Sequence, residues 1–176
     1  MNRIHRKHQV KLKQFKYRKI QIFQSITVLQ KVIGNVDVKT KTVHFYVQRN
    51  STFKAERVNI PFQVERLNEG GGMNLNSGVF TAPVPGIYHF EFIGSKGESA
   101  MMLDVYLQLN GDNIGHTCAY EPAEKNEETV ALSASLRLKA GDRVSLFIDY
   151  NSILYDDPNL RTHFTGWLVE EDLSID

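Results

Sequence analysis

The fold is decided by residues 62–92, which read FQVERLNEGGGMNLNSGVFTAPVPGIYHFEF. At the end of this stretch aromatic and polar side chains alternate. Tyr88, Phe90 and Phe92 therefore share one face of a strand, and the polar residues between them share the other face. Three large aromatic side chains on one face bury a large apolar area. The stretch thus predicts a central strand with one face in the interior of a β-sheet protein.

The same alternation recurs in three later segments that are bounded by turn residues. These segments are Met101–Asn110, Thr129–Lys139 and Arg143–Tyr150, and we expect Met101 and Tyr150 to point inward with the other alternate residues. Turn-forming pairs such as Asn110-Gly111 and Gly141-Asp142 stand at the strand ends. The pattern predicts an all-β fold, a ten-strand antiparallel jelly-roll sandwich, preceded by a short N-terminal helix.

The spacing within the deciding stretch matches a known domain. Phe62, Asn68, Met73 and Phe80 precede Gly86, with five, four, six and five residues between successive members. This resembles the signature of the globular head of complement C1q, in which aromatic residues surround an Asn or Asp before Gly-x-Tyr-x-Phe-x-aromatic. Met73 departs from the family, which usually has an aromatic residue or Leu there, and we expect packing to absorb the adaptable Met side chain.

Two further stretches extend the resemblance over about residues 42–170. Gly141-Asp142-Arg143-Val144 is similar to the Gly-Asp-x-Val turn of the family, and Phe164–Leu168 is similar to its last strand. The resemblance implies a member of the C1q and tumour-necrosis-factor superfamily without a collagen repeat. Its signature residues are core and turn residues, so they identify a fold rather than a chemistry. They are Phe62, Asn68, Phe80, Gly86, Tyr88, Phe90, Phe92, Gly141, Phe164 and Gly166.

A basic segment precedes this acidic body. Residues 1–36 hold nine of the 21 Lys and Arg residues and none of the 20 Asp and Glu residues. From Leu12 to Val36 apolar residues follow steps of three and four, interrupted at Lys19. This spacing is typical of an amphipathic helix. We therefore predict a basic helical arm or coiled-coil stalk at 1–40 and a C1q-like jelly-roll domain at 41–172.

The arm has three competing interpretations. The apolar residues spaced by three and four from Leu12 to Val36, called the seam here, favour a stalk that trimerises. The unopposed positive charge favours an arm that binds nucleic acid or an anionic membrane. The basic, acid-free and amphipathic character favours a transit peptide. No membrane span is predicted, because no run of about 20 apolar residues occurs. No signal peptide is recognisable, although the resemblance implies a secreted protein. A missing first exon would explain this conflict.

Catalytic chemistry finds little support in the sequence. A single cysteine, Cys118, excludes a disulfide framework and a zinc site made of several thiolates. The sequence contains neither a Gly-x-Ser-x-Gly elbow nor a His-Glu-x-x-His motif, and we expect a protein that is not an enzyme and requires no cofactor. Cys118 alternates with His116 and Tyr120, and we expect it to be a buried small hydrophobe.

Two positions are candidates for ligands or modification. Some C1q-like heads bind calcium through a carboxylate near the trimer apex, and Glu128 resembles that ligand by its distance from Gly141. One aligned carboxylate does not define a calcium site, which needs six to eight oxygens, and a solvated acidic loop is the alternative. Asn50-Ser51-Thr52 is an N-glycosylation sequon, which has meaning only in a secreted chain.

The resemblance implies a homotrimer that binds an extracellular protein or glycan. Tyr106, Phe147 and Trp167 occupy outward positions of the expected strands, and such large apolar side chains predict a subunit interface. The leading hypothesis is an innate-immunity protein for pattern recognition, lectin-like or directed at microbial surfaces. The alternative is a secreted signalling or synapse-organising ligand for a cell-surface receptor. No nucleic-acid partner is expected.

Overall fold

The computed structural model describes residues 14–25, 40–97, 100–120 and 127–173. The chain divides into two units, Met1–Val38 and Lys39–Asp176. In the first unit residues 14–25 form a helix on which Phe15 and Ile22 are exposed, which confirms the short N-terminal helix. The rest of the predicted seam lies outside the described residues. No helix among the described residues is long and apolar enough to cross a membrane.

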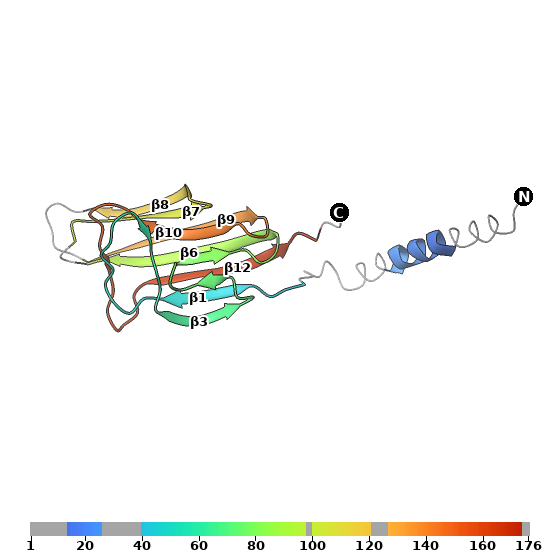
Figure 1. Ribbon diagram of the computed structural model, residues 1–176, viewed down its shortest axis with the longest axis horizontal. Helices are drawn as coiled ribbons and strands as arrows, with labels where there is room; N and C mark the ends of the chain where they lie inside the picture. Colours follow the sequence, from blue (N-terminus) through green and yellow to red (C-terminus); the bar gives the residue numbers. More distant parts are fainter. Residues whose placement is uncertain (1–13, 26–39, 98–99, 121–126, 174–176) are drawn as a thin grey trace, which may run out of the picture. The chain divides into compact units, whose positions relative to one another are not determined.

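The second unit is a sandwich of two antiparallel sheets, which confirms the predicted all-β jelly roll (Figure 1). Its strands are β1 (His44–Gln48), β2 (Val58–Asn59), β3 (Val64–Glu69), β4 (Met73–Asn74), β5 (Val79–Thr81), β6 (Gly86–Lys96), β7 (Met102–Leu109), β8 (Asp112–Tyr120), β9 (Glu128–Leu138), β10 (Arg143–Ile148), β11 (Leu154–Tyr155) and β12 (His163–Glu171). The described residues thus contain twelve strands, where the sequence predicted ten. β2, β4 and β11 have two residues each, too few for an alternating pattern to reveal.

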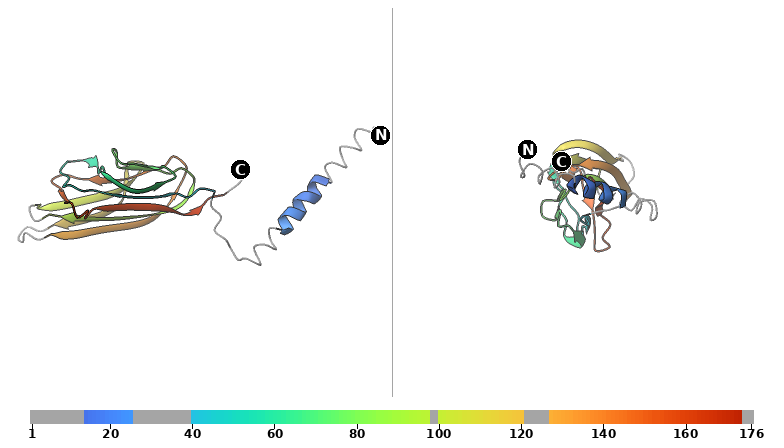
Figure 2. Two further views of the ribbon diagram at one scale, coloured as in Figure 1. Left: turned by 90° about the horizontal axis from the view of Figure 1, so that it is seen from below. Right: turned by 90° about the vertical axis from the view of Figure 1, so that its right-hand side faces the viewer.

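The long strands of both sheets lie along nearly the same axis, with neighbouring strands antiparallel, as the further views show (Figure 2). The first sheet, called sheet A here, has the order β11-β6-β12-β1-β3, with β9 also paired to β6. The second, called sheet B, has the order β4-β5-β10-β7-β8, with β2 paired to β10. Apart from β4-β5 and β7-β8, neighbouring strands are not consecutive in the sequence, so the topology brings distant residues together on each face.

Aromatic side chains from both sheets fill the space between them. Phe80 of sheet B lies with its ring centroid 5.1 Å from that of Phe45 and 5.6 Å from those of Tyr88 and Phe90, all of sheet A. Phe164 stacks on Phe62 at 5.8 Å. All six side chains are at most 3% exposed. The signature aromatics therefore form the core, as the alternation predicted.

The predicted inward phase is correct along β6, β7, β9 and β10 and wrong at three residues, two beside strands and one within β8. Met101 precedes β7 and is 66% exposed, and Tyr150 follows the end of β10 and is 53% exposed. Both lie where the pleat no longer fixes the direction of a side chain. Cys118 is exposed, because Ala119 points inward instead. The prediction of a buried Cys118 is thus wrong by one residue of strand phase.

Gly166 provides the space that the aromatic rings occupy. A Cβ atom at this position would lie 2.6 Å from Phe45 and 2.6 Å from Phe90. Real Cβ atoms do not approach carbon so closely, so only glycine permits both rings to cover β12 here. Met73 is 4% exposed, which confirms that packing absorbs this departure from the family pattern.

The core makes a direct prediction for Phe90. Phe90→Ala should lower the free energy of unfolding by about 3 to 5 kcal/mol, because it removes a ring that touches both sheets and leaves a cavity. Denaturant melts of the full chain measure this loss. Tyr150→Ala is the matched control, since it removes an exposed ring and should cost about 0.5 kcal/mol or less. A loss below about 1 kcal/mol for Phe90→Ala would contradict this account of the core.

Candidate functional site

Asn68 closes the turn that leads from β3 to β4. Its side-chain amide donates to the carbonyl of Met73 at 2.9 Å, and its Oδ1 accepts from the Met73 amide at 3.1 Å. The Asn68 carbonyl accepts from the Gly71 amide at 3.1 Å. The polar member of the aromatic signature therefore satisfies the backbone of a glycine-rich turn, and its role is structural.

Gly141 and Asp142 form the turn between β9 and β10, and Gly141 has a φ of +90° that favours glycine. The Asp142 carboxylate accepts from the Lys139 amide at 2.7 Å and from the Asn110 side-chain amide at 3.1 Å. Asn110 in turn accepts from the Arg143 amide at 2.9 Å. These hydrogen bonds join the turn of the β7–β8 hairpin to the turn that leads from β9 of sheet A to β10 of sheet B. The backbone hydrogen bond from Lys139, followed by that from Asn110, lowers the pKa of Asp142.

Trp167 lies at the centre of the outer face of sheet A. It pairs with His44 of β1 on one side and with His89 of β6 on the other. Its ring centroid is 6.0 Å from that of His44 and 4.8 Å from that of His89. His89 continues the row through a hydrogen bond of 2.9 Å with Ser135 of β9. Four strands thus contribute one side chain each to this row, in which the three rings are half-buried and Ser135 is exposed.

A second row crosses the same face nearer the other end of the strands. Tyr46 and His163 stack with ring centroids 5.7 Å apart, and the Tyr46 hydroxyl lies 2.6 Å from His163 Nδ1. Gln48 Nε2 is 3.4 Å from the same nitrogen. Thr165 lies between the rows and donates its hydroxyl to the Phe45 carbonyl at 2.8 Å. The outer face of sheet A is therefore ordered by aromatic and imidazole contacts.

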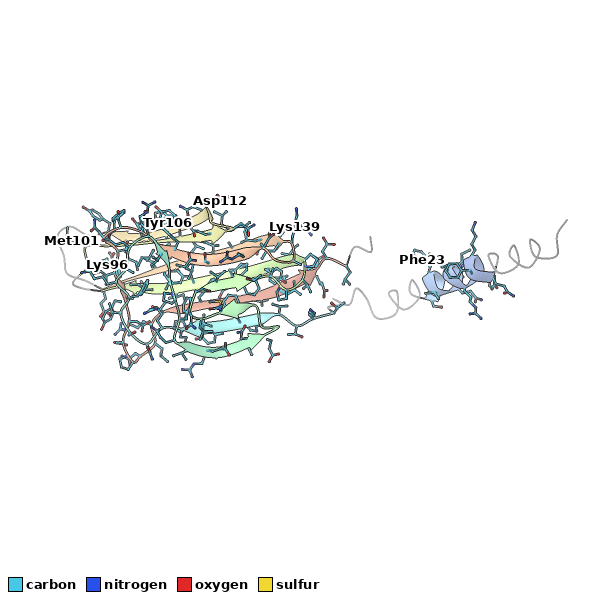
Figure 3. All side chains as sticks on the ribbon, in the orientation of Figure 1. Phe23, Lys96, Met101, Tyr106, Asp112 and Lys139 are labelled. Atoms are coloured by element: carbon cyan, nitrogen blue, oxygen red, sulfur yellow. The ribbon has the colours of Figure 1, made fainter. Side chains whose placement is uncertain are left out.

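Tyr106 and Phe147 lie on the other sheet. They are paired residues of β7 and β10, and both are half-buried on the outer face of sheet B. Figure 3 labels Tyr106 on β7. The structure thus brings two of the three predicted interface residues together and places Trp167 on the opposite outer face. Their role in a trimer remains a prediction for each residue.

The remaining predicted positions lie at loops and strand ends. Glu128 begins β9 and pairs with Lys96, and its neighbours 121–126 lie outside the described residues, so the calcium ligand remains a prediction. Asn50 is exposed just after β1, and Thr52 of its sequon donates to the Asp156 carbonyl at 3.0 Å. Glycosylation of Asn50 remains a prediction.

One cluster of side chains was not predicted from the sequence. Asp104, His116 and Cys118 place their ligand atoms within 4.8 Å of one another, and they are the group of metal-ligand type found in the described part of the chain. The i, i+2 spacing of His116 and Cys118 was visible. Asp104 was not, because the register between β7 and β8 decides which carboxylate faces them.

Comparison with known proteins shows where the chain belongs. Residues 44–169 match the C1q domain family. The chain belongs to the C1q domain family. It is 33% identical over 131 residues to complement C1q tumor necrosis factor-related protein 2 of Mus musculus, which covers 73% of this chain and 43% of that protein. It is 31% identical over 129 residues to related protein 3 of Homo sapiens, covering 73% and 52%. The chain thus spans about half the length of these relatives.

Solved structures share the fold of this C1q domain. The globular domain of zebrafish complement 1qA has a TM-score of 0.61 at 22% identity, and the alignment covers 74% of this chain and 99% of that one. Murine APRIL has a TM-score of 0.58 at 12% identity, covering 73% and 100%. Eiger TNF from S. frugiperda has a TM-score of 0.57 at 12% identity, covering 77% and 99%. The C1q domain therefore has the jelly-roll fold that its signature predicted.

Asp142 predicts how the stability of the C1q domain depends on pH. Its folded pKa lies below the ordinary value of 3.8, so the ionised carboxylate stabilises the fold above that pH. The stabilisation is lost as the pH falls through the folded pKa. Asp142→Asn should therefore lower the thermal midpoint at pH 7 by a few degrees, about 0.5 to 1.5 kcal/mol for one lost hydrogen bond.

Thermal melts between pH 7 and pH 2.5 measure this difference. It should shrink once the pH is below about 3.8, because both proteins then carry an uncharged side chain. Asp112→Asn, a change of an exposed residue in the neighbouring hairpin, is the control and should melt within a degree or two of the wild type. A constant difference across the range would show that charge at Asp142 does not stabilise the turn.

Proposed function

We propose that this chain is an oligomeric, non-enzymatic binding protein of the extracellular space that assembles as a homotrimer. Membership of the C1q domain family supports a binding or signalling role. The observation that carries the proposal is the outer face of sheet A. Its rows of half-buried rings expose an ordered apolar surface that a monomer rarely leaves uncovered.

The side chains of this face suit a subunit interface. Trp167 and Tyr46 are rigid amphipathic rings, the residue type enriched in the centres of interfaces. The Tyr46 hydroxyl already has a partner in His163 on the same face, so burial does not leave it unsatisfied. Long paired strands hold the rows in place before association. This reduces the conformational entropy that is lost when subunits assemble.

A trimer would present three identical sets of loops on one rigid body. Once one subunit has bound a surface, the other subunits bind at the effective concentration set by the first contact. The avidity of the trimer can therefore exceed the affinity of a single site by about 10² to 10⁴-fold. A multivalent protein of this kind suits a microbial or glycan-bearing surface on which the ligand is repeated. We therefore propose pattern recognition in innate immunity, lectin-like in type, as the leading function.

The names of the relatives favour a second candidate. The chain resembles proteins called C1q tumor necrosis factor-related, which supports a secreted signalling or synapse-organising ligand that clusters a receptor. The same trimer serves both roles, since only the loops distinguish the ligands. In either role the exposed Asn50 is available for a glycan, which would itself mark passage through the secretory pathway.

The assembly proposal is tested by one charge on each outer face. Trp167→Glu should convert the protein to a folded monomer, because it would bury an unpaired carboxylate in the interface. Phe147→Glu tests the predicted role of the opposite face in the same way. Sedimentation equilibrium at low micromolar concentration measures the mass, and circular dichroism shows that each variant is folded.

Tyr150→Glu is the matched control, since it places a charge at an exposed position beyond the end of β10. It should leave the mass unchanged. A trimer that persists in Trp167→Glu would exclude the outer face of sheet A as the interface. A trimer that persists in Phe147→Glu would contradict the prediction that Phe147 lies in a subunit interface.

A pair of binding screens separates the two candidate roles. The wild-type protein should bind arrayed microbial glycans, and Trp167→Glu should lose at least about a hundredfold of that binding while the fold persists. The same pair of proteins is applied to a panel of displayed cell-surface receptors. Saturable receptor binding without glycan binding would reject the leading function in favour of the signalling candidate.

A further inference from the structure

We propose that Asp104, His116 and Cys118 bind a borderline-soft divalent transition metal, of which Zn²⁺ is the representative, on the outer face of sheet B. Asp104 belongs to β7, and His116 and Cys118 belong to β8. Asp104 and Cys118 are directly paired across the two strands, and His116 stands two residues before Cys118 on the same face. The site thus uses two adjacent strands of the folded domain rather than a loop.

The spacing of the ligand atoms fits a metal after small rotations. His116 Nε2 lies 3.1 Å from Asp104 Oδ1, and the three ligand atoms lie within 4.8 Å of one another. In a tetrahedral zinc site with bonds of about 2.0 to 2.3 Å, ligand atoms are roughly 3.3 to 3.6 Å apart. The paired backbone of β7 and β8 already provides most of this closeness, and side-chain rotation provides the rest.

The surroundings hold two of the three ligands in place. Tyr106 stacks on His116 with centroids 4.4 Å apart and planes 19° apart, which restricts the imidazole ring. Asp104 is fixed through its backbone, because its amide donates to Ser152 Oγ at 2.9 Å and its carbonyl accepts from the Asp149 amide at 3.2 Å. The aromatic contact and the paired backbone thus hold His116 and Asp104 close to Cys118.

The donor set indicates the class of metal. Thiolate, imidazole and carboxylate together suit Zn²⁺ and its borderline-soft neighbours, whereas Ca²⁺ and Mg²⁺ prefer oxygen ligands alone. Ionised Cys118 and Asp104 would neutralise the two charges of the ion. Three protein ligands leave a fourth position for water or for a donor from a bound molecule. An exposed free cysteine, unusual on a protein surface, acquires a role in this arrangement.

Metal binding is measured on the full chain, stripped with a chelator and kept reduced. Titration with Zn²⁺ by calorimetry should give one such site per chain and raise the thermal midpoint. Co²⁺ in place of Zn²⁺ should give a thiolate-to-metal charge-transfer band. Cys118→Ser should abolish that band, and Asp104→Asn and His116→Gln should each weaken Zn²⁺ binding by at least about tenfold.

His89→Gln is the matched control, because His89 forms a similar imidazole–carboxylate pair, 3.3 Å from Glu91, without a thiol. His5→Gln/His8→Gln controls for binding by the histidines of the basic arm. Both controls should retain the thiolate band and the affinity, and excess Ca²⁺ should not displace Co²⁺. Absence of the band in the wild type, or equal Zn²⁺ affinity in Cys118→Ser, would overturn the proposal.

Discussion

The rest of the structure depends on the contact between aromatic rings across the two sheets. Phe80 of sheet B packs against three rings of sheet A, and Gly166 leaves the space in which two of those rings cover β12. This packing determines which side chains of each strand face inward, because the neighbours of each inward ring point to the opposite face. The rows around Trp167 and the pair Tyr106 and Phe147 face outward as a consequence of where the core rings point.

The two outer faces have different characters and therefore suit different tasks. The face of sheet A presents aromatic and imidazole rings, and Tyr46 and His89 have local hydrogen-bond partners, which suits burial against another subunit. The face of sheet B combines an aromatic pair with a carboxylate, an imidazole and a thiol, which suits binding of a cation. A single sandwich can separate assembly from ligand binding in this way without any change in its core.

The sequence predicted the core well and the surfaces only in part, for a physical reason. A strand's inward residues are readable because burial selects for apolar side chains at a period of two, so Tyr88 and Phe90 were placed correctly. Which outward residues meet depends on register between strands distant in the sequence. Asp104 and Cys118 form a pair that no local pattern reveals, and Trp167 could not be assigned to the opposite sheet from Phe147. The exposed Cys118 shows how a one-residue error in strand phase reverses a functional inference.

The claim that an ordered apolar face drives assembly is tested most directly by the mass of the wild-type protein in solution. Sedimentation equilibrium over a range of low micromolar concentrations gives this mass without any substitution. The chain has a mass of 20.1 kDa, so the account predicts a species of three times that value that persists on dilution. A monomer at every concentration would contradict it, because the rings of sheet A would then remain exposed to water.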